Sequence, residues 1–165
     1  RTVEMITRFR KIVELLSSHK IEFIVVGGLA AIVHGSPRLT QDVDVVYSRS
    51  AENLQRIVDA LRPHEPYLRG APPGLPFLWD ARTLKNGLNF TLRTTLGDID
   101  LLGEITGGGG YENLLPHSQE LPMFGVRARV LDLDKLIEVK RAAGRPKDFE
   151  TIAELEAIRE ELKGQ

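Results

Sequence analysis

The spacing of apolar residues divides the chain into helical and extended segments. Apolar residues at intervals of three and four predict an amphipathic helix over 3–19 and another over 51–61. The same spacing predicts two closing helices, over 133–143 and 147–162. The expected buried stripes of the first two helices are Val3, Ile6, Phe9, Val13 and Leu16, and Leu54, Ile57, Val58 and Leu61.

The segment between the first two helices predicts two strands joined by a short helix. The continuous apolar run over 21–26 is typical of a strand that is buried on both faces. A short helix is expected over 29–33, with Gly35 as its C-terminal cap. Pro37 breaks the chain ahead of a strand over 42–46.

The stretch over 62–86 is rich in proline and glycine. It predicts an extended excursion with one helical turn near 81–85. Phe77 and Trp79 within this stretch are interpreted as anchors of a small core rather than as a platform for base stacking.

Strand-like alternation returns in the second half of the chain. Two antiparallel strands are expected over 88–93 and 98–102, around a turn at Gly97. The tetraglycine over 107–110 predicts a flexible connection, and 126–131 predicts a further strand.

Composition is that of an ordinary globular protein. The 165 residues, 42% of them hydrophobic and 27% charged, suit one domain with a sizeable core. A formal net charge of -1 argues against a non-specific nucleic-acid binder. The absence of cysteine excludes disulfides and thiolate metal sites. Since the sequence shows neither a membrane-spanning run nor a signal peptide, we expect a cytoplasmic location and no membrane partner.

Asp42 and Asp44 are the first candidates for chemistry. They lie on a predicted strand with one residue between them, so their side chains share one face, at a Cα separation of about 6.6 Å. Two such carboxylates repel each other unless a positive charge lies between them, and oxygen ligands favour Mg²⁺ or Mn²⁺. The pair is therefore interpreted either as a divalent metal site or as the solvated face of an edge strand.

A glycine pair, Gly27-Gly28, stands between the first predicted strand and the short helix. Glycines in that place let phosphate oxygens approach backbone N–H groups. A phosphate cradle beside paired carboxylates is what phosphoryl or nucleotidyl transfer requires. The glycine pair thus favours the metal interpretation of Asp42 and Asp44.

The whole segment resembles the polymerase-beta-like nucleotidyltransferase superfamily, with its glycine pair or Gly-Ser, short helix and Asp-x-Asp on the next strand. It is similar to the small bacterial branch that includes the AbiEii-type toxins. The residues that carry the resemblance are Gly27, Gly28, His34, Gly35, Arg38, Thr40, Asp42 and Asp44. The resemblance implies an α/β nucleotidyltransferase fold with a mixed β-sheet flanked by helices. It also implies a single nucleotidyltransferase domain over 1–165, with a helical C-terminal part at about 132–165.

In this superfamily a third carboxylate comes from a later strand beside the Asp-x-Asp strand. Asp98 and Asp100 share one face of a predicted strand. Asp100, which two leucines follow, is the better match, and Asp98 is the reserve. The resemblance then implies that Asp42, Asp44 and Asp100 bind metal and act in catalysis. The third aspartate is a candidate to accept the proton of the attacking hydroxyl.

Lys140 lies on the apolar stripe of the predicted helix over 133–143, four residues after Leu136. Either its ammonium reaches water while its methylenes are buried, or its charge faces a triphosphate. The AbiEii-type branch has a lysine followed by an Arg-x-x-Lys/Arg-Asp element here, which implies that Lys140, Arg145 and Asp148 belong to the nucleotide site. The alternatives are that Asp148 is an acid at a helix N-terminus and that Arg145 pairs with nearby acids.

Arg38 and Thr40 complete the candidate nucleotide site. Arg38 is interpreted as a contact to the substrate or as a lock on its own loop. Thr40 shares a face with Asp42 and Asp44 and is a candidate to orient a carboxylate. His34 is expected to end a helix rather than to act as a general base.

Together these features predict transfer of a nucleoside monophosphate from an NTP to a hydroxyl, with Mg²⁺ or Mn²⁺. Gly27 and Gly28 would hold phosphate and Lys140 would neutralise charge. The resemblance implies a tRNA 3′ end or a protein side chain as the acceptor, and a cognate toxin or antitoxin chain as a candidate partner. The alternatives are a catalytically idle or partner-dependent nucleotide-binding subunit and a hydrolytic phosphate-binding enzyme.

Overall fold

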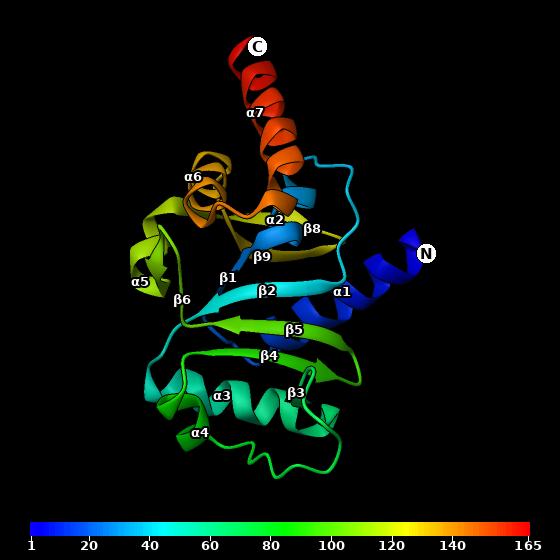
Figure 1. The fold of residues 1–165 in the computed structure, drawn as a ribbon, viewed down its shortest axis with the longest axis vertical. Helices are drawn as coiled ribbons and strands as arrows, with labels where there is room; N and C mark the ends of the chain where they lie inside the picture. The colour runs from blue at the N-terminus through cyan, green and yellow to red at the C-terminus, as the bar shows by residue number, and fades with distance from the viewer.

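Seven strands form one mixed sheet at the centre of the structure, a computed structural model that describes residues 1–165. In spatial order (Figure 1) they are Tyr67–Leu68 (β3), Asn89–Thr94 (β4), Gly97–Leu102 (β5), Asp42–Tyr47 (β2), Phe23–Val26 (β1), Val126–Leu131 (β9) and Ser118–Met123 (β8). β2 is parallel to β5, and β1 is parallel to β9. The remaining neighbours in this sheet are antiparallel. Glu104–Ile105 (β6) and Gly109–Gly110 (β7) form a separate two-stranded sheet.

Helices flank this sheet, so the expected α/β class is confirmed. They are Thr2–Ser18 (α1), Gly27–Val33 (α2), Ala51–Leu61 (α3), Ala81–Asn86 (α4), Tyr111–Leu114 (α5), Leu133–Ala143 (α6) and Phe149–Lys163 (α7). α2 contacts β1, β2 and α6, whereas α1 and α3 contact each other. α7 packs on α6 and then extends away from the body to the C-terminus (Figure 1). None of the helices combines the length and the apolar composition that crossing a membrane requires.

The two longest predicted helices of the first half exist, but the buried face of α1 differs from the expected one. Val3 is 75% exposed, and the buried stripe begins two residues later, at Met5. The buried residues of α1 are Met5, Phe9, Ile12, Val13 and Leu16, at spacings of three and four. In α3 the predicted stripe is confirmed, and the Ser50 hydroxyl oxygen caps the helix by accepting a hydrogen bond from the Asn53 N–H at 3.2 Å.

The short helix α2 ends as the sequence predicted, at His34 and Gly35. The Gly35 N–H donates to the Ile32 carbonyl at 3.0 Å, and the Ser36 N–H donates to the Ala31 carbonyl at 2.9 Å. This pair of bonds is a Schellman closure, which Gly35 permits with its φ of 115°. The His34 ring nitrogen Nε2 lies 2.7 Å from the Leu131 carbonyl oxygen and so ties α2 to β9.

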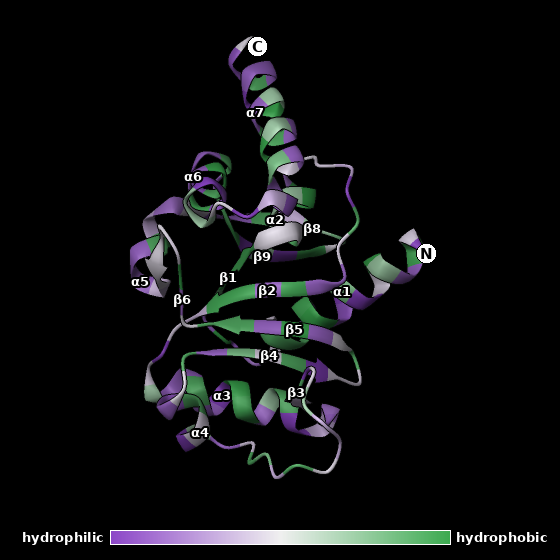
Figure 2. Cartoon of the chain, viewed as in Figure 1, coloured by the Kyte–Doolittle hydropathy of each residue, from purple (hydrophilic) through white to green (hydrophobic).

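The strands β1 and β2 separate the core from the polar face on which the aspartates lie. All four residues of β1 are buried, as predicted. In β2, Val43 and Val45 are fully buried, while Asp42 and Asp44 face the other side. Figure 2 shows the result as apolar green at the C-terminal ends of β2 and β5 and polar purple toward their N-terminal ends.

The sequence analysis missed five elements: β3, β6, β7, α5 and β8. β8 is an edge strand with polar residues and with Pro122, which an edge strand tolerates. β3 has only two residues, inside the Pro/Gly-rich stretch. In that stretch the helical turn expected near 81–85 is α4, and Trp79 is buried, with its indole N–H donating to the Val58 carbonyl at 3.0 Å. Phe77 packs against the same core, which confirms both aromatics as core anchors.

The tetraglycine is not the flexible connection that the sequence predicted. Two of its glycines form β7, and the segment packs closely on α5 and α6. A Cβ on Gly107 would lie 2.4 Å from the Ala142 Cβ, and one on Gly108 would lie 3.1 Å from Val139 Cγ1. The glycines are therefore required for close packing rather than for flexibility.

Candidate active site

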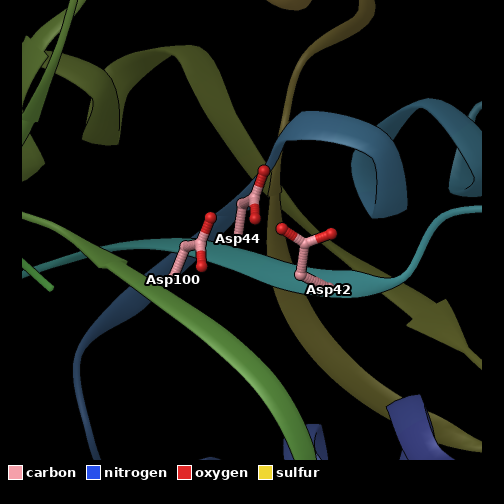
Figure 3. A group of neighbouring side chains, drawn as sticks. All are labelled: Asp42, Asp44 and Asp100. Atoms are coloured by element: carbon pink, nitrogen blue, oxygen red, sulfur yellow. The ribbon is translucent and has the colours of Figure 1, made fainter. Parts of the chain in front are cut away.

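The parallel pairing of β2 with β5 brings together two pairs of aspartates. Asp42 lies opposite Asp98, and Asp44 lies opposite Asp100. One carboxylate oxygen from each of Asp42, Asp44 and Asp100 lies within 4.8 Å of the others. Figure 3 shows these three carboxylates on the same side of the two strands, close to the start of α2. Such a group of oxygens has the donor chemistry that Mg²⁺ and Mn²⁺ prefer.

Asp44 is the most strongly perturbed of these carboxyl groups. Burial, as the largest cause, and repulsion from Asp100 and Asp42 together raise its pKa to about 8. Its Oδ1 atom is buried and has no hydrogen-bond partner. Burial and Asp100 also raise the pKa of Asp42. The nearby charge of Lys140 lowers the pKa of Asp44 but does not offset burial and the other two carboxylates.

Gly27 lies directly against Asp44. A Cβ at position 27 would lie 2.2 Å from Asp44 Oδ2, and Gly27 has a φ of 64°. Gly28 faces the other side of the turn, where a Cβ would lie 2.7 Å from Thr40 Oγ1. The glycine pair therefore lets the backbone approach the carboxylates and Thr40 more closely than any side chain would allow.

Lys140 of α6 points into the protein. Its side chain is 6% exposed, and its Nζ lies 3.5 Å from Asp148 Oδ1. Asp148, at the start of α7, also accepts a hydrogen bond from Arg145 Nε at 2.8 Å. The ammonium is thus buried beside a carboxylate, and the alternative in which it reaches water is wrong.

Two cavities meet at the aspartates and at Lys140. The first, of about 360 Å³, has a mixed apolar and polar lining, which consists of Val26, Gly27, Asp44, Asp100, Leu102, Glu104, Ile105, Thr106, Leu136, Val139, Lys140, Ala143 and Arg145. The second, of about 240 Å³, is polar and is lined by Gly28, Ala31, Ser36, Arg38, Leu39, Thr40, Asp42, Asp44, Asp100, Lys140, Arg145, Lys147, Asp148 and Thr151. Every residue that the sequence singled out for metal or nucleotide, except the reserve candidate Asp98, therefore lines at least one of the two.

Arg38 has protein partners in addition to its place at the polar cavity. Its Nη2 lies 2.5 Å from Glu150 Oε2, and its Nε lies 2.9 Å from Glu154 Oε1, both on α7. These contacts fasten the loop before β2 to the C-terminal helix, in line with the interpretation of Arg38 as a lock on its own loop.

Arg69 is a charged residue beside the aspartates that the sequence analysis missed. Its guanidinium contacts Asp100, lies 3.4 Å from Asp98 Oδ2 and lies 3.9 Å from Asp42 Oδ2. It follows β3, a strand of two residues, in a stretch with no periodic pattern. The only signal for it in the sequence was an isolated arginine in a long proline-rich segment.

Comparisons with known proteins identify the fold. No family model and no curated protein matches this chain. Among solved structures, the chain is similar to the lincosamide antibiotic adenylyltransferase LnuA, with a TM-score of 0.62, 15% identity, and 92% of this chain and 96% of LnuA covered. The chain has a nucleotidyltransferase fold. The fold class predicted from the sequence is thereby confirmed.

Two further solved structures agree with this assignment. The Thermotoga maritima protein TM1012, described as a candidate nucleotidyltransferase, matches with a TM-score of 0.54, 16% identity, and coverage of 95% of this chain and 91% of that protein. The antibiotic-resistance factor ANT(2'')-Ia matches with a TM-score of 0.52, 15% identity, and coverage of 96% and 91%. The resemblance to the AbiEii-type branch stays a prediction from the sequence motifs.

Proposed function

We propose that this chain is a metal-dependent nucleotidyltransferase that moves an NMP from an NTP to an acceptor hydroxyl. The observation that carries the proposal is the convergence of Asp42, Asp44 and Asp100, with one buried oxygen of Asp44 left without a partner. The fold likeness to LnuA, an adenylyltransferase by name, supports the same reaction type.

The three aspartates fit a divalent ion, because the cluster offers only oxygen ligands and the buried Oδ1 of Asp44 has no hydrogen-bond partner. Asp42, Asp44 and Asp100 would hold Mg²⁺ or Mn²⁺. A divalent ion bound there supplies charge neutralisation for a triphosphate and lowers the pKa of a nearby hydroxyl. The buried Oδ1 of Asp44, which has no hydrogen-bond partner, would then gain a positive charge beside it, and the cost of burying it unpaired would fall.

The polar cavity supports binding of the triphosphate. Arg145 and Lys147 line it, and Gly28 presents backbone without a side chain there. Lys140 lines both cavities, so its ammonium can face the phosphoryl group that is transferred. Because α2, β2, β5, α6 and α7 all contribute to these cavities, we infer that residues 1–165 work as a single domain.

We assign Asp100 as the group that accepts the proton of the attacking hydroxyl at a carboxylate oxygen. Asp100 lines both cavities. It therefore lies between a triphosphate in the polar cavity and an acceptor hydroxyl in the other cavity. Asp98, the reserve candidate, lies two residues before Asp100 on β5, opposite Asp42, and lines neither cavity.

The acceptor follows from the motif resemblance to the AbiEii-type branch, which favours an RNA 3′ end such as that of tRNA, or a protein side chain. The same resemblance makes a cognate toxin or antitoxin chain the expected partner. LnuA is named for a lincosamide acceptor, so small antibiotic hydroxyls belong in the test as well.

The test is transfer of label from each α-³²P-labelled NTP, with Mg²⁺ or Mn²⁺, to total RNA, total protein or a lincosamide. We expect one NTP to label one acceptor class. Asp44→Asn is expected to abolish the transfer because it removes a metal ligand. Asp59→Asn, the same change on the exposed face of α3, is the matched control and is expected to keep full activity.

Retained activity in Asp44→Asn would contradict the proposal. Absence of transfer under every combination, with or without a co-expressed partner chain, would favour the nucleotide-binding subunit instead. Release of inorganic phosphate or pyrophosphate without labelling of any acceptor would indicate the hydrolytic alternative.

A further inference from the structure

Arg69 spans the outer side of the carboxylate cluster. Its Nη2 contacts Asp100 and lies 3.9 Å from Asp42, whereas its Nη1 lies 3.4 Å from Asp98. Nη2 therefore lies beside two of the three candidate metal ligands, whereas Nη1 lies beside Asp98, which is not one of the three. Asp44 is the member of the trio that Arg69 does not contact.

The position of Arg69 follows from the register of three strands. Its N–H donates to the Thr91 carbonyl at 2.9 Å, and Thr91 lies opposite Asp100. The long arginine side chain thus crosses over β4 to reach β5. Because the side chain of Arg69 is only 23% exposed, its ion pairs are less screened than those at the surface.

The turn that carries Arg69 borders open space. The Ala71 N–H donates to the Leu68 carbonyl at 3.2 Å and closes a turn with Arg69 and Gly70 at its centre. Gly70 has a φ of 86°, as the third position of a type II turn requires. No atom lies within 4 Å of a Cβ placed on Gly70, so open space adjoins the turn.

We propose that Arg69 is an internal counter-cation that competes with the divalent ion for Asp42 and Asp100. Without an ion, Arg69 offsets the repulsion among the aspartates, so that the fold tolerates the cluster. When an ion binds, Arg69 gives up Asp42 and Asp100 and stays on Asp98. Arg69 therefore sets how tightly the site binds its ion, an inference that rests on the proposed metal site.

The test is Mn²⁺ binding, measured from the EPR signal of the free ion with the full chain and no nucleotide. Arg69→Gln is expected to bind Mn²⁺ about tenfold more tightly than the unaltered protein, because the competing charge is gone. In the presence of EDTA the same variant is expected to melt at a lower temperature. Saturating Mn²⁺ is expected to raise its melting temperature by more than that of the unaltered protein.

Arg93→Gln is the matched control. Arg93 lies on β4 opposite Asp98 and forms no ion pair with the cluster, although its removal changes the net charge by the same amount. Its Mn²⁺ affinity is expected to stay within about twofold of the unaltered protein. An equal gain in Mn²⁺ affinity in both variants would mean that the loss of any nearby positive charge has this effect, and it would overturn the inference.

Two other results separate the inference from the metal site itself. Mn²⁺ binding by Arg69→Gln that equals or falls below that of the unaltered protein, while Asp44→Asn loses binding, overturns the role of Arg69 and leaves the metal site standing. Absence of binding in every protein overturns the metal site and the inference with it. If Arg69→Gln does not fold, Arg69→Lys takes its place, and it is also expected to bind Mn²⁺ more tightly because an ammonium cannot span Asp98 and Asp100 together.

Discussion

Gly27 and Asp44 are packed so closely that position 27 cannot carry a side chain. A Cβ there would lie 2.2 Å from Asp44 Oδ2 and 3.0 Å from its Cγ. The position of the buried Asp44 carboxylate therefore depends on the absence of a side chain at Gly27, directly after β1.

Gly27→Ala is expected to abolish nucleotidyl transfer and Mn²⁺ binding, because the new methyl group displaces the Asp44 carboxylate. The φ of 64° also strains the folded state, so we expect the free energy of unfolding to fall by about 1–2 kcal/mol. Gly74→Ala is the control, since Gly74 has a φ of 88° but nothing within 4 Å. Gly74→Ala is expected to lower the free energy of unfolding by a similar amount and to keep its activity. Normal activity in Gly27→Ala would contradict this account.

The raised pKa of Asp44 predicts how the stability of the metal-free protein varies with pH. Its folded pKa of about 8 lies above the ordinary value of 3.8, so the folded state holds a proton that the unfolded state releases. This contribution to stability is complete below about pH 4 and is lost as the pH rises through 8. We expect a fall of roughly 2–5 kcal/mol in the free energy of unfolding over that range.

Urea unfolding in EDTA at several pH values measures this effect. Asp44→Asn removes the titrating group and is expected to flatten most of the slope, and to be more stable than the unaltered protein at pH 8. A slope that is the same in both proteins would place the titration elsewhere.

Lys140→Met tests the buried ammonium. The substitution keeps much of the side-chain volume but leaves Asp148 with Arg145 alone, so we expect a loss of about 1–3 kcal/mol in stability. Activity is expected to fall about 100-fold, because the variant removes the charge that we propose faces the phosphates. Lys11→Met, on the exposed face of α1, is expected to change neither. A variant that is destabilised but fully active would make Lys140 a purely structural residue.

The tetraglycine offers a test of packing that is separate from the site. Gly107→Ala is expected to lower the free energy of unfolding by about 2 kcal/mol or more, through the contact with Ala142 and the φ of 77°. Adding Ala142→Gly removes the contact and is expected to restore part of that stability, although this change alone destabilises α6 by about 1 kcal/mol. Strictly additive losses in the double variant would show that the two residues do not clash.

The carboxylate cluster was predictable because strand periodicity is a local signal. Asp42 and Asp44 share a face by their spacing alone, and the resemblance supplied Asp100 from the neighbouring strand. Arg69 was not predictable in this way, because its contact depends on a two-residue edge strand pairing with β4. β8 was hidden by its polar residues and Pro122, and the close packing of Gly107 depends on α6, which follows much later in the chain.

The most direct test of the central claim compares α-³²P-labelled with γ-³²P-labelled NTP in the presence of Mn²⁺ and an acceptor. Nucleotidyl transfer predicts that the acceptor takes label from the α-phosphate and none from the γ-phosphate, and that Asp44→Asn transfers neither. Label from the γ-phosphate on the acceptor, or equal transfer by Asp44→Asn, would contradict the assignment of the three aspartates to NMP transfer.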